Sequence, residues 1–148
     1  MQLSPADDIL ISIEKALDID SQGQMIASVL SKKAAAGSTH VLIDIPVGPG
    51  VKIANAAAAS HLKNRFLKIG RMLGMKVKVI ITDGSQPIGN GIGPFLEMID
   101  VMKVLKNESD APADLREKGV MESAILLELT GKAKHGRGRK MAEELLQS

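Results

Sequence analysis

A glycine-rich loop over residues 82–93, TDGSQPIGNGIG, is the first candidate for chemistry in this sequence. Gly89 and Gly91, on either side of Asn90, leave backbone amides free to point at an anion, as in a phosphate-binding loop. The stretch matches neither GxxxxGK[ST] nor a strict GxGxxG, so it is a weak nucleotide signature. A tight turn between a strand and a helix explains the same residues, and Asp83 then either orients a ligand or caps that turn.

A second group of polar residues lies between positions 20 and 52. Ser28 and Lys32 are four residues apart and share one face of a predicted helix, and Lys33 follows them. Asp20 precedes the amino terminus of that helix, where the helix dipole favours an acid by about 0.3–1 kcal/mol without any chemistry. Lys52 follows a glycine-rich strand end, where a ligand can approach the backbone closely. The structural alternative is a capping Asp20, a small Ser28 that allows close packing, and solvated lysines.

Metal and thiol chemistry are not expected from this sequence. His40, His61 and His135 are widely separated, and no HxxxH or HExxH spacing occurs. The chain has no cysteine, which excludes disulfides, thiol catalysis and cysteine metal sites. We therefore predict no metal and no cofactor.

A helix and a strand must position the second polar group. Ser21 and Gln24 have the spacing of a capping box, and Gly37 is placed to end the helix that follows. Residues 41–47, VLIDIPV, are apolar and β-branched, which predicts a buried parallel strand in which the charge of Asp44 needs a partner.

The remaining pattern predicts an α/β fold: a three-layer sandwich with a small, mainly parallel sheet flanked by helices. Its ligand site is expected beyond the carboxyl ends of the strands, where PVGPGVK and TDGSQPIGNGIG emerge. The other predicted elements are a turn over 4–8 and a short strand over 9–14, a helix over 52–74, a strand over 75–83, a helix over 95–106 with Pro94 in its first turn, and helical segments over 112–118, 121–130 and 139–146.

Composition limits the classes of partner. The 148 residues fit one domain, aromatic residues make up only 1%, and the net charge of +2 is spread along the chain. Base stacking and a nucleic-acid partner are therefore not expected, whereas small anionic ligands are compatible with the sequence. No apolar run approaches the roughly 18 residues of a membrane span, and the first residues do not resemble a signal peptide, which predicts a cytoplasmic protein.

Three blocks of the sequence carry a family resemblance: LSPADDILI, DIDSQGQMIASVLSKKAAAGSTHVLIDIPVGPGVK and ITDGSQPIGNGIGPFLE. Together they resemble the central α/β domain of the class II nucleoside phosphorylases, most closely the AMP phosphorylase or archaeal-type thymidine phosphorylase branch. The likeness runs from about Leu3 to about Leu146. It implies that residues 1–148 form a single α/β domain, part of the large phosphate- and nucleoside-binding domain of a longer enzyme.

The resemblance implies a pentosyltransferase, in which inorganic phosphate as co-substrate displaces the base of a nucleoside or nucleoside 5′-monophosphate. By residue-by-residue correspondence, Asp20 is the proton donor to the leaving base, and Ser28, Lys32 and Lys52 bind substrate. A carboxylic acid in that role must keep its proton near neutral pH, which requires burial or a raised pKa. Possible loop contacts are Asp83, Gly89, Asn90 and Gly91. The full-length enzyme is expected to be a homodimer.

The sequence departs from the family in two respects. The amino-terminal phosphate-binding loops, the Ser-Gly-Arg stretch and the carboxy-terminal domain have no counterpart here, so we expect a fragment with little or no turnover by itself. Ser12 stands where the archaeal-type branch usually has an arginine after a strand. The sequence does not choose between nucleosides and nucleoside monophosphates. A non-catalytic α/β module that binds a nucleotide or anion, and a purely structural assembly domain, are the alternatives.

Overall fold

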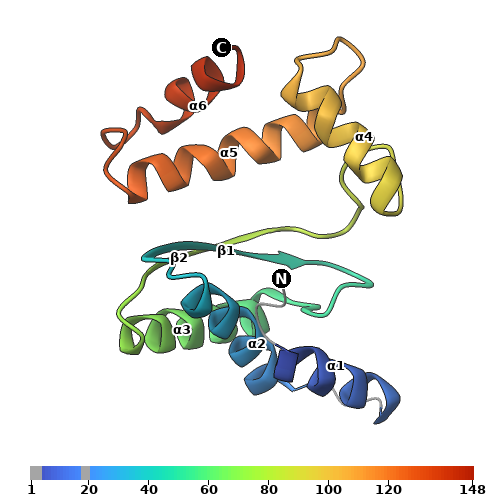
Figure 1. Ribbon diagram of the computed structural model, residues 1–148, viewed down its shortest axis with the longest axis vertical. Helices are drawn as coiled ribbons and strands as arrows, with labels where there is room; N and C mark the ends of the chain where they lie inside the picture. Colours follow the sequence, from blue (N-terminus) through green and yellow to red (C-terminus); the bar gives the residue numbers. More distant parts are fainter. Residues whose placement is uncertain (1–4, 18–20) are drawn as a thin grey trace. The chain divides into compact units, whose positions relative to one another are not determined.

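A computed structural model describes residues 5–17 and 21–148 of the chain. The chain divides into two compact units, one ending at Thr82 and the other beginning at Asp83, and each is described by itself. The first unit contains α1 (Pro5–Leu17), α2 (Gln22–Ala35), β1 (His40–Val47) and α3 (Ala56–Met72), with β2 (Lys76–Asp83) ending at the boundary; the second contains α4 (Pro94–Leu105), α5 (Ala113–Leu129) and α6 (Gly138–Leu146) (Figure 1).

In the first unit, the structure confirms the helix predicted after Ser21, the strand predicted over residues 41–47, and the residues predicted to begin and end that helix. The Ser21 hydroxyl accepts a hydrogen bond from the Gln24 amide at 3.5 Å, and Gly37 has a φ of 70°, in the left-handed region that suits glycine. In β1 the charge of Asp44 has a partner, because the Thr82 hydroxyl donates to its Oδ1 atom at 2.8 Å. These local signals set the position of α2 and β1 along the chain.

The sheet has two strands within the described residues, and they are parallel. The Lys76 amide donates to the Thr39 carbonyl at 2.8 Å where the strands begin, and the contact between Thr82 and Asp44 lies near their other ends. Helix α3 therefore forms the crossover connection that parallel strands require. The α/β class with a small parallel sheet is confirmed.

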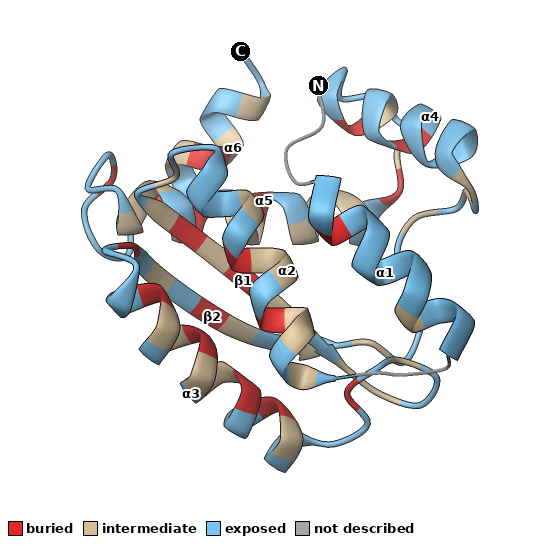
Figure 2. Ribbon diagram, turned by 60° about the horizontal axis from the view of Figure 1, so that its bottom comes forward, coloured by how far each residue is buried: buried red, intermediate tan, exposed pale blue. Residues whose placement is uncertain are grey.

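The core of the first unit lies between this sheet and helices α2 and α3. Alternate residues of β1 are buried, and Figure 2 shows them as red bands on the strand, with the buried residues of α2 and α3 facing the sheet. Both helices lie on the same side of the strands (Figure 1). A third layer therefore stays a prediction. The largest fully buried side chains of this core are Ile26, Leu30 and Leu62.

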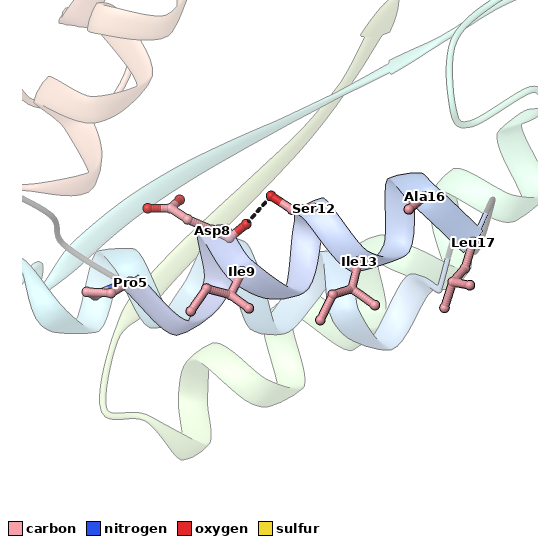
Figure 3. A pocket seen from close by; sticks show the side chains of 7 residues that line it. All are labelled: Pro5, Asp8, Ile9, Ser12, Ile13, Ala16 and Leu17. Atoms are coloured by element: carbon pink, nitrogen blue, oxygen red, sulfur yellow. Dashed lines mark hydrogen bonds between the residues drawn. The ribbon is translucent and has the colours of Figure 1, made fainter.

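The predicted strand over residues 9–14 is wrong, because these residues belong to α1. Pro5 suits the first helical position, and the acids Asp7 and Asp8 in the first turn and Lys15 in the last complement the helix dipole. The isoleucines that alternate in the sequence also recur at helical spacing. Figure 3 shows Ile9, Ile13 and Leu17 on one side of α1, along an open hollow.

A helix break predicted between residues 118 and 121 is also wrong. Helix α5 continues through Gly119, whose conformational cost of about 1 kcal/mol is too small to end a helix of this length. The predicted start of α4 at Pro94 is confirmed. In the second unit α5 packs against α6 around Val120, Ala124 and Ala142. No helix in the described ranges is long and apolar enough to cross a membrane.

Candidate functional site

A buried carboxylate joins the two candidate residues of α2. Asp7 of α1 is 5% exposed, and its Oδ2 atom accepts a hydrogen bond from the Ser28 hydroxyl at 2.8 Å. The Lys32 ammonium lies 2.6 Å from the same oxygen and 3.4 Å from the Ser28 oxygen. Ser28 and Lys32 thus share one helix face, as their spacing predicts. Asp7, Ser28 and Lys32 are called the carboxylate cluster below.

The carboxylate cluster keeps Asp7 ionised. The hydrogen bond from Lys32, above all, lowers the pKa of the Asp7 carboxyl, and the Ser28 hydroxyl adds to this effect. Burial acts in the opposite direction because it disfavours the charged form. The Asp7 carboxylate is thus paired with a lysine whose side chain is still 38% exposed and open to a ligand.

Asp7 is the site residue that the sequence analysis missed. The sequence predicts a turn over residues 4–8, which is wrong because α1 begins at Pro5, and a turn gives no reason to place Asp7 against Ser28, which lies 21 residues further along the chain. A helical interpretation, supported by the acids after Pro5, would have placed Asp7 in a first turn but would not have identified its partners. Such a contact depends on how two helices pack.

The other two candidate residues of the first unit are Asp20 and Lys52. Asp20, the expected proton donor, lies outside the described residues. Lys52 lines a cavity of about 240 Å³ between α2, β1 and α3, whose lining is apolar except for Lys52 and Asp44. Met25 and Val29 of α2 also line it, and Val29 adjoins Ser28 in sequence. Helix α2 thus contributes to both features, with Met25 and Val29 in the cavity lining and Ser28 and Lys32 in the carboxylate cluster.

Ser12 lies within α1, where its hydroxyl donates to the Asp8 carbonyl at 2.8 Å (Figure 3). It does not follow a strand, as the resemblance implied, so that part of the expectation is wrong.

The amides of the glycine-rich loop bind the protein's own carboxylates. Asn90 and Gly91 both donate to Oδ2 of Asp100 at 2.7 Å, and Gly89 donates to Asp114 at 3.1 Å. Asp100 is 6% exposed. The loop thus has the amide geometry of an anion cradle, but a side chain of α4 supplies the anion. A role for Gly89, Asn90 and Gly91 in binding a ligand stays a prediction.

Close packing explains one glycine of this loop. A Cβ atom on Gly91 would lie 2.6 Å from the carbonyl carbon of Leu96, a separation that real Cβ atoms do not show. Asp83 caps the turn at the start of the loop, because its Oδ1 atom accepts from the Ser85 amide at 2.9 Å. That backbone hydrogen bond lowers the pKa of the Asp83 carboxyl. The turn interpretation of Asp83 thus has a defined contact, and its role as a ligand contact stays a prediction.

A metal site is not formed by the parts of the chain that the structure describes: no three His, Asp or Glu side chains in them are grouped so as to hold an ion. The carboxylate cluster offers one carboxylate, one hydroxyl and one ammonium group. An ammonium group donates hydrogen bonds and repels cations, so the cluster suits a polar organic ligand better than a metal ion.

Comparison with known proteins identifies relatives along the whole chain. No family model matches it. It is 53% identical over 146 residues, 99% of its length, to "Putative thymidine phosphorylase 1" of Acidovorax sp. strain JS42. It is 57% identical over all 148 residues to "Putative thymidine phosphorylase" of Bradyrhizobium sp. strain BTAi1, and 51% identical to the protein of the same name from Parvibaculum lavamentivorans.

These matches cover one segment of each relative, because the chain spans only 29% of their length. The structure has the α/β fold that the resemblance implies, and the sequence matches confirm the resemblance to the nucleoside phosphorylases. Over its whole length the chain is a homologue of a segment of the proteins named thymidine phosphorylase. The archaeal-type branch and the AMP phosphorylases stay predictions.

Proposed function

We propose that this chain forms the nucleoside-binding part of a pentosyltransferase that cleaves an N-glycosidic bond with inorganic phosphate. The observation that carries the proposal is the identity of 51–57% to the thymidine phosphorylase relatives along the whole chain. The site supports it, because Ser28 and Lys32, the two residues of α2 expected to bind substrate, lie together, and Lys52 lines a cavity to which α2 also contributes Met25 and Val29.

The proposed reaction is a displacement at the sugar C1′ atom. A phosphate oxygen forms a bond to C1′, and the bond from C1′ to the base nitrogen breaks with its electron pair leaving on the base. The base takes up a proton, and the products are the free base and a sugar 1-phosphate. Phosphate is a co-substrate, and the proposal includes no metal or cofactor. The protein contributes by holding the reactants together and by stabilising the charge that develops on the sugar and the base.

Asp20 is the proposed proton donor to the leaving base, because protonation makes the base a better leaving group. Thymidine is the proposed nucleoside, since the relatives carry that substrate in their names. AMP and other nucleoside monophosphates are the alternative substrates. As parts of the same proposal, the complete enzyme is a cytoplasmic homodimer and does not bind nucleic acid.

An amide NMR titration of the chain with thymidine and, separately, AMP tests the binding part of the proposal, with and without phosphate. We expect saturable shifts for thymidine that cluster at Ser28, Lys32 and Lys52. Stronger binding of AMP would favour the nucleotide branch. Shifts confined to the loop around Asn90, or none with either ligand at millimolar concentration, would contradict the proposed site.

Turnover requires the remainder of a phosphorylase, so the catalytic role of Asp20 is tested in a chimera. In it, this chain replaces the homologous segment of the Acidovorax protein. We expect thymine release from thymidine and phosphate, and we expect Asp20→Asn to lower kcat much more than it raises KM, because the proton is needed only in the transition state. Equal losses in kcat and in binding would count against the proton-donor role.

A non-catalytic anion-binding module is the second candidate, and the structure weakens it. The amides of Asn90 and Gly91 already have a carboxylate acceptor in Asp100, so an external anion would have to displace a side chain that is 6% exposed. This candidate predicts phosphate binding that survives Asp20→Asn and perturbs the loop. The phosphorylase proposal predicts nucleoside binding at α2.

A further inference from the structure

Asp7 is a buried charge that the proposed reaction does not use. It is 5% exposed, and a buried carboxylate is costly unless other groups hydrogen-bond to it and balance its charge. Its two partners from α2 are Ser28 and Lys32, the residues proposed to contact substrate. The neighbouring acid Asp8 is exposed and therefore carries no comparable constraint.

The contacts of Asp7 decide what Ser28 and Lys32 can offer a ligand. A serine hydroxyl has one proton, and Ser28 gives it to Asp7, which leaves the Ser28 oxygen as an acceptor. The Lys32 ammonium has three N–H groups, and within the described residues its contacts to Asp7 and Ser28 use two of them, which leaves one for a ligand. The carboxylate cluster thus presents one donor from Lys32 in a fixed place.

We propose that Asp7 is a positioning residue, which holds Ser28 and Lys32 in the orientation in which they bind the nucleoside. The inference rests on the proposed function of α2. Asp7 acts through its two partners and touches no substrate. A lysine on a helix surface samples many rotamers, and ordering it on ligand binding costs conformational entropy. An ion pair that already holds the lysine in place reduces this cost. The simpler alternative is that Asp7 only ties α1 to α2.

The test compares thymidine binding by three forms of the chain: wild type, Asp7→Asn and the matched control Asp8→Asn. Binding is followed by the amide shifts of α2, and the free-state spectrum of each variant reports whether it is folded. We expect Asp7→Asn to weaken thymidine binding about tenfold or more, as is typical for loss of a charged, buried hydrogen bond that orders a site. Asp8→Asn should bind like the wild type.

The outcomes separate the two proposals. If Asp7→Asn melts at a lower temperature but binds thymidine as the wild type does, Asp7 only ties the helices and the positioning role is overturned. If the wild-type chain binds neither thymidine nor AMP, the proposed function of α2 and the positioning role that rests on it are both overturned. If the wild type binds and only Asp7→Asn loses affinity, both proposals are supported.

A measurement on the wild type covers the case in which Asp7→Asn does not fold. The hydrogen bond to Asp7 should slow the exchange of the ¹⁵N-attached protons of the Lys32 ammonium with water, relative to a lysine without such a partner. We expect this slow exchange to persist in the chain saturated with thymidine. Faster exchange on binding would overturn the positioning role, because Asp7 would then compete with the nucleoside for Lys32.

Discussion

Asp100 is the residue whose replacement should affect the second unit most directly. Its carboxylate accepts from the amides of Asn90 and Gly91, each at 2.7 Å, and it is 6% exposed. Asp100→Ala leaves both amides without that acceptor. Since an unsatisfied donor costs about 1–3 kcal/mol, we expect the free energy of unfolding to fall by at least that amount, measured by urea denaturation.

Asp114→Ala is the matched control for this prediction. Asp114 accepts from the Gly89 amide at 3.1 Å, but it is exposed, so water can replace the lost acceptor. We expect a smaller loss of stability than for Asp100→Ala. Equal losses for the two variants would show that the burial of Asp100 is not what makes its hydrogen bonds important.

The two buried acids also show the limit of prediction from sequence at this scale. The glycine loop correctly indicates amides arranged around an anion, but the anion is Asp100, a side chain of the following helix. Similarly, the spacing of Ser28 and Lys32 predicts their shared face and gives no sign of Asp7. Local patterns show which groups a segment can offer. Which group hydrogen-bonds to them depends on how separate segments pack together, and that packing cannot be predicted from the pattern of one segment.

At the scale of elements, the close approach of α5 and α6 depends on Gly138. A Cβ atom at this position would lie 2.3 Å from the carbonyl oxygen of Ala124, which belongs to the backbone of α5 and cannot turn aside. Gly138→Ala should therefore push α6 away from α5. We expect a loss of about 1–3 kcal/mol in the free energy of unfolding, as for overpacking in other cores, measured by thermal or urea denaturation.

Gly119→Ala is the control for Gly138→Ala. Gly119 lies inside α5, and a Cβ atom there would meet no heavy atom within 4 Å. Because alanine is the better helix former, this variant should be stabilised by about 0.5–1 kcal/mol. A destabilised Gly119→Ala, or an unchanged Gly138→Ala, would contradict the packing described here.

Prediction of the elements succeeds where single residues fix a boundary and fails where periodicity alone decides. Ser21, Gly37 and Pro94 mark helix ends correctly, because capping and φ preferences are local. The isoleucines of α1 fit a period of two as well as a helical period, and the dipole-compatible charges around them favour the helix. In α5, packing of Val120 against α6 outweighs the weak helix propensity of Gly119.

At the scale of the whole molecule, ionised carboxylates stabilise both compact units. In the first unit, the hydrogen bond from Lys32 is the main cause of the lowered pKa of Asp7. In the second, the amides of Gly138 and Gly136 donate to Glu128 at 3.0 and 2.9 Å, and the first of these contacts is the main cause of its lowered pKa. Acid should therefore weaken the first unit through Asp7 and the second through Glu128, together with Asp110 and Glu117, whose pKa values are lowered by their contacts with Lys103 and Arg139.

The direction of this pH effect follows from linkage. A carboxyl whose pKa is lower in the folded than in the unfolded chain binds fewer protons when folded, so its full contribution to stability is present above the unfolded pKa of about 4. That contribution is lost as pH falls through the lower, folded pKa. We expect the urea midpoint to be constant between about pH 7 and 5 and to fall below pH 4, with residue-specific amide signals reporting each unit. Glu128→Gln should reduce the acid response of the second unit, in which Asp110 and Glu117 still titrate, and should leave that of the first unit unchanged. A midpoint that stays constant down to about pH 3 would show that these carboxylates are not linked to folding.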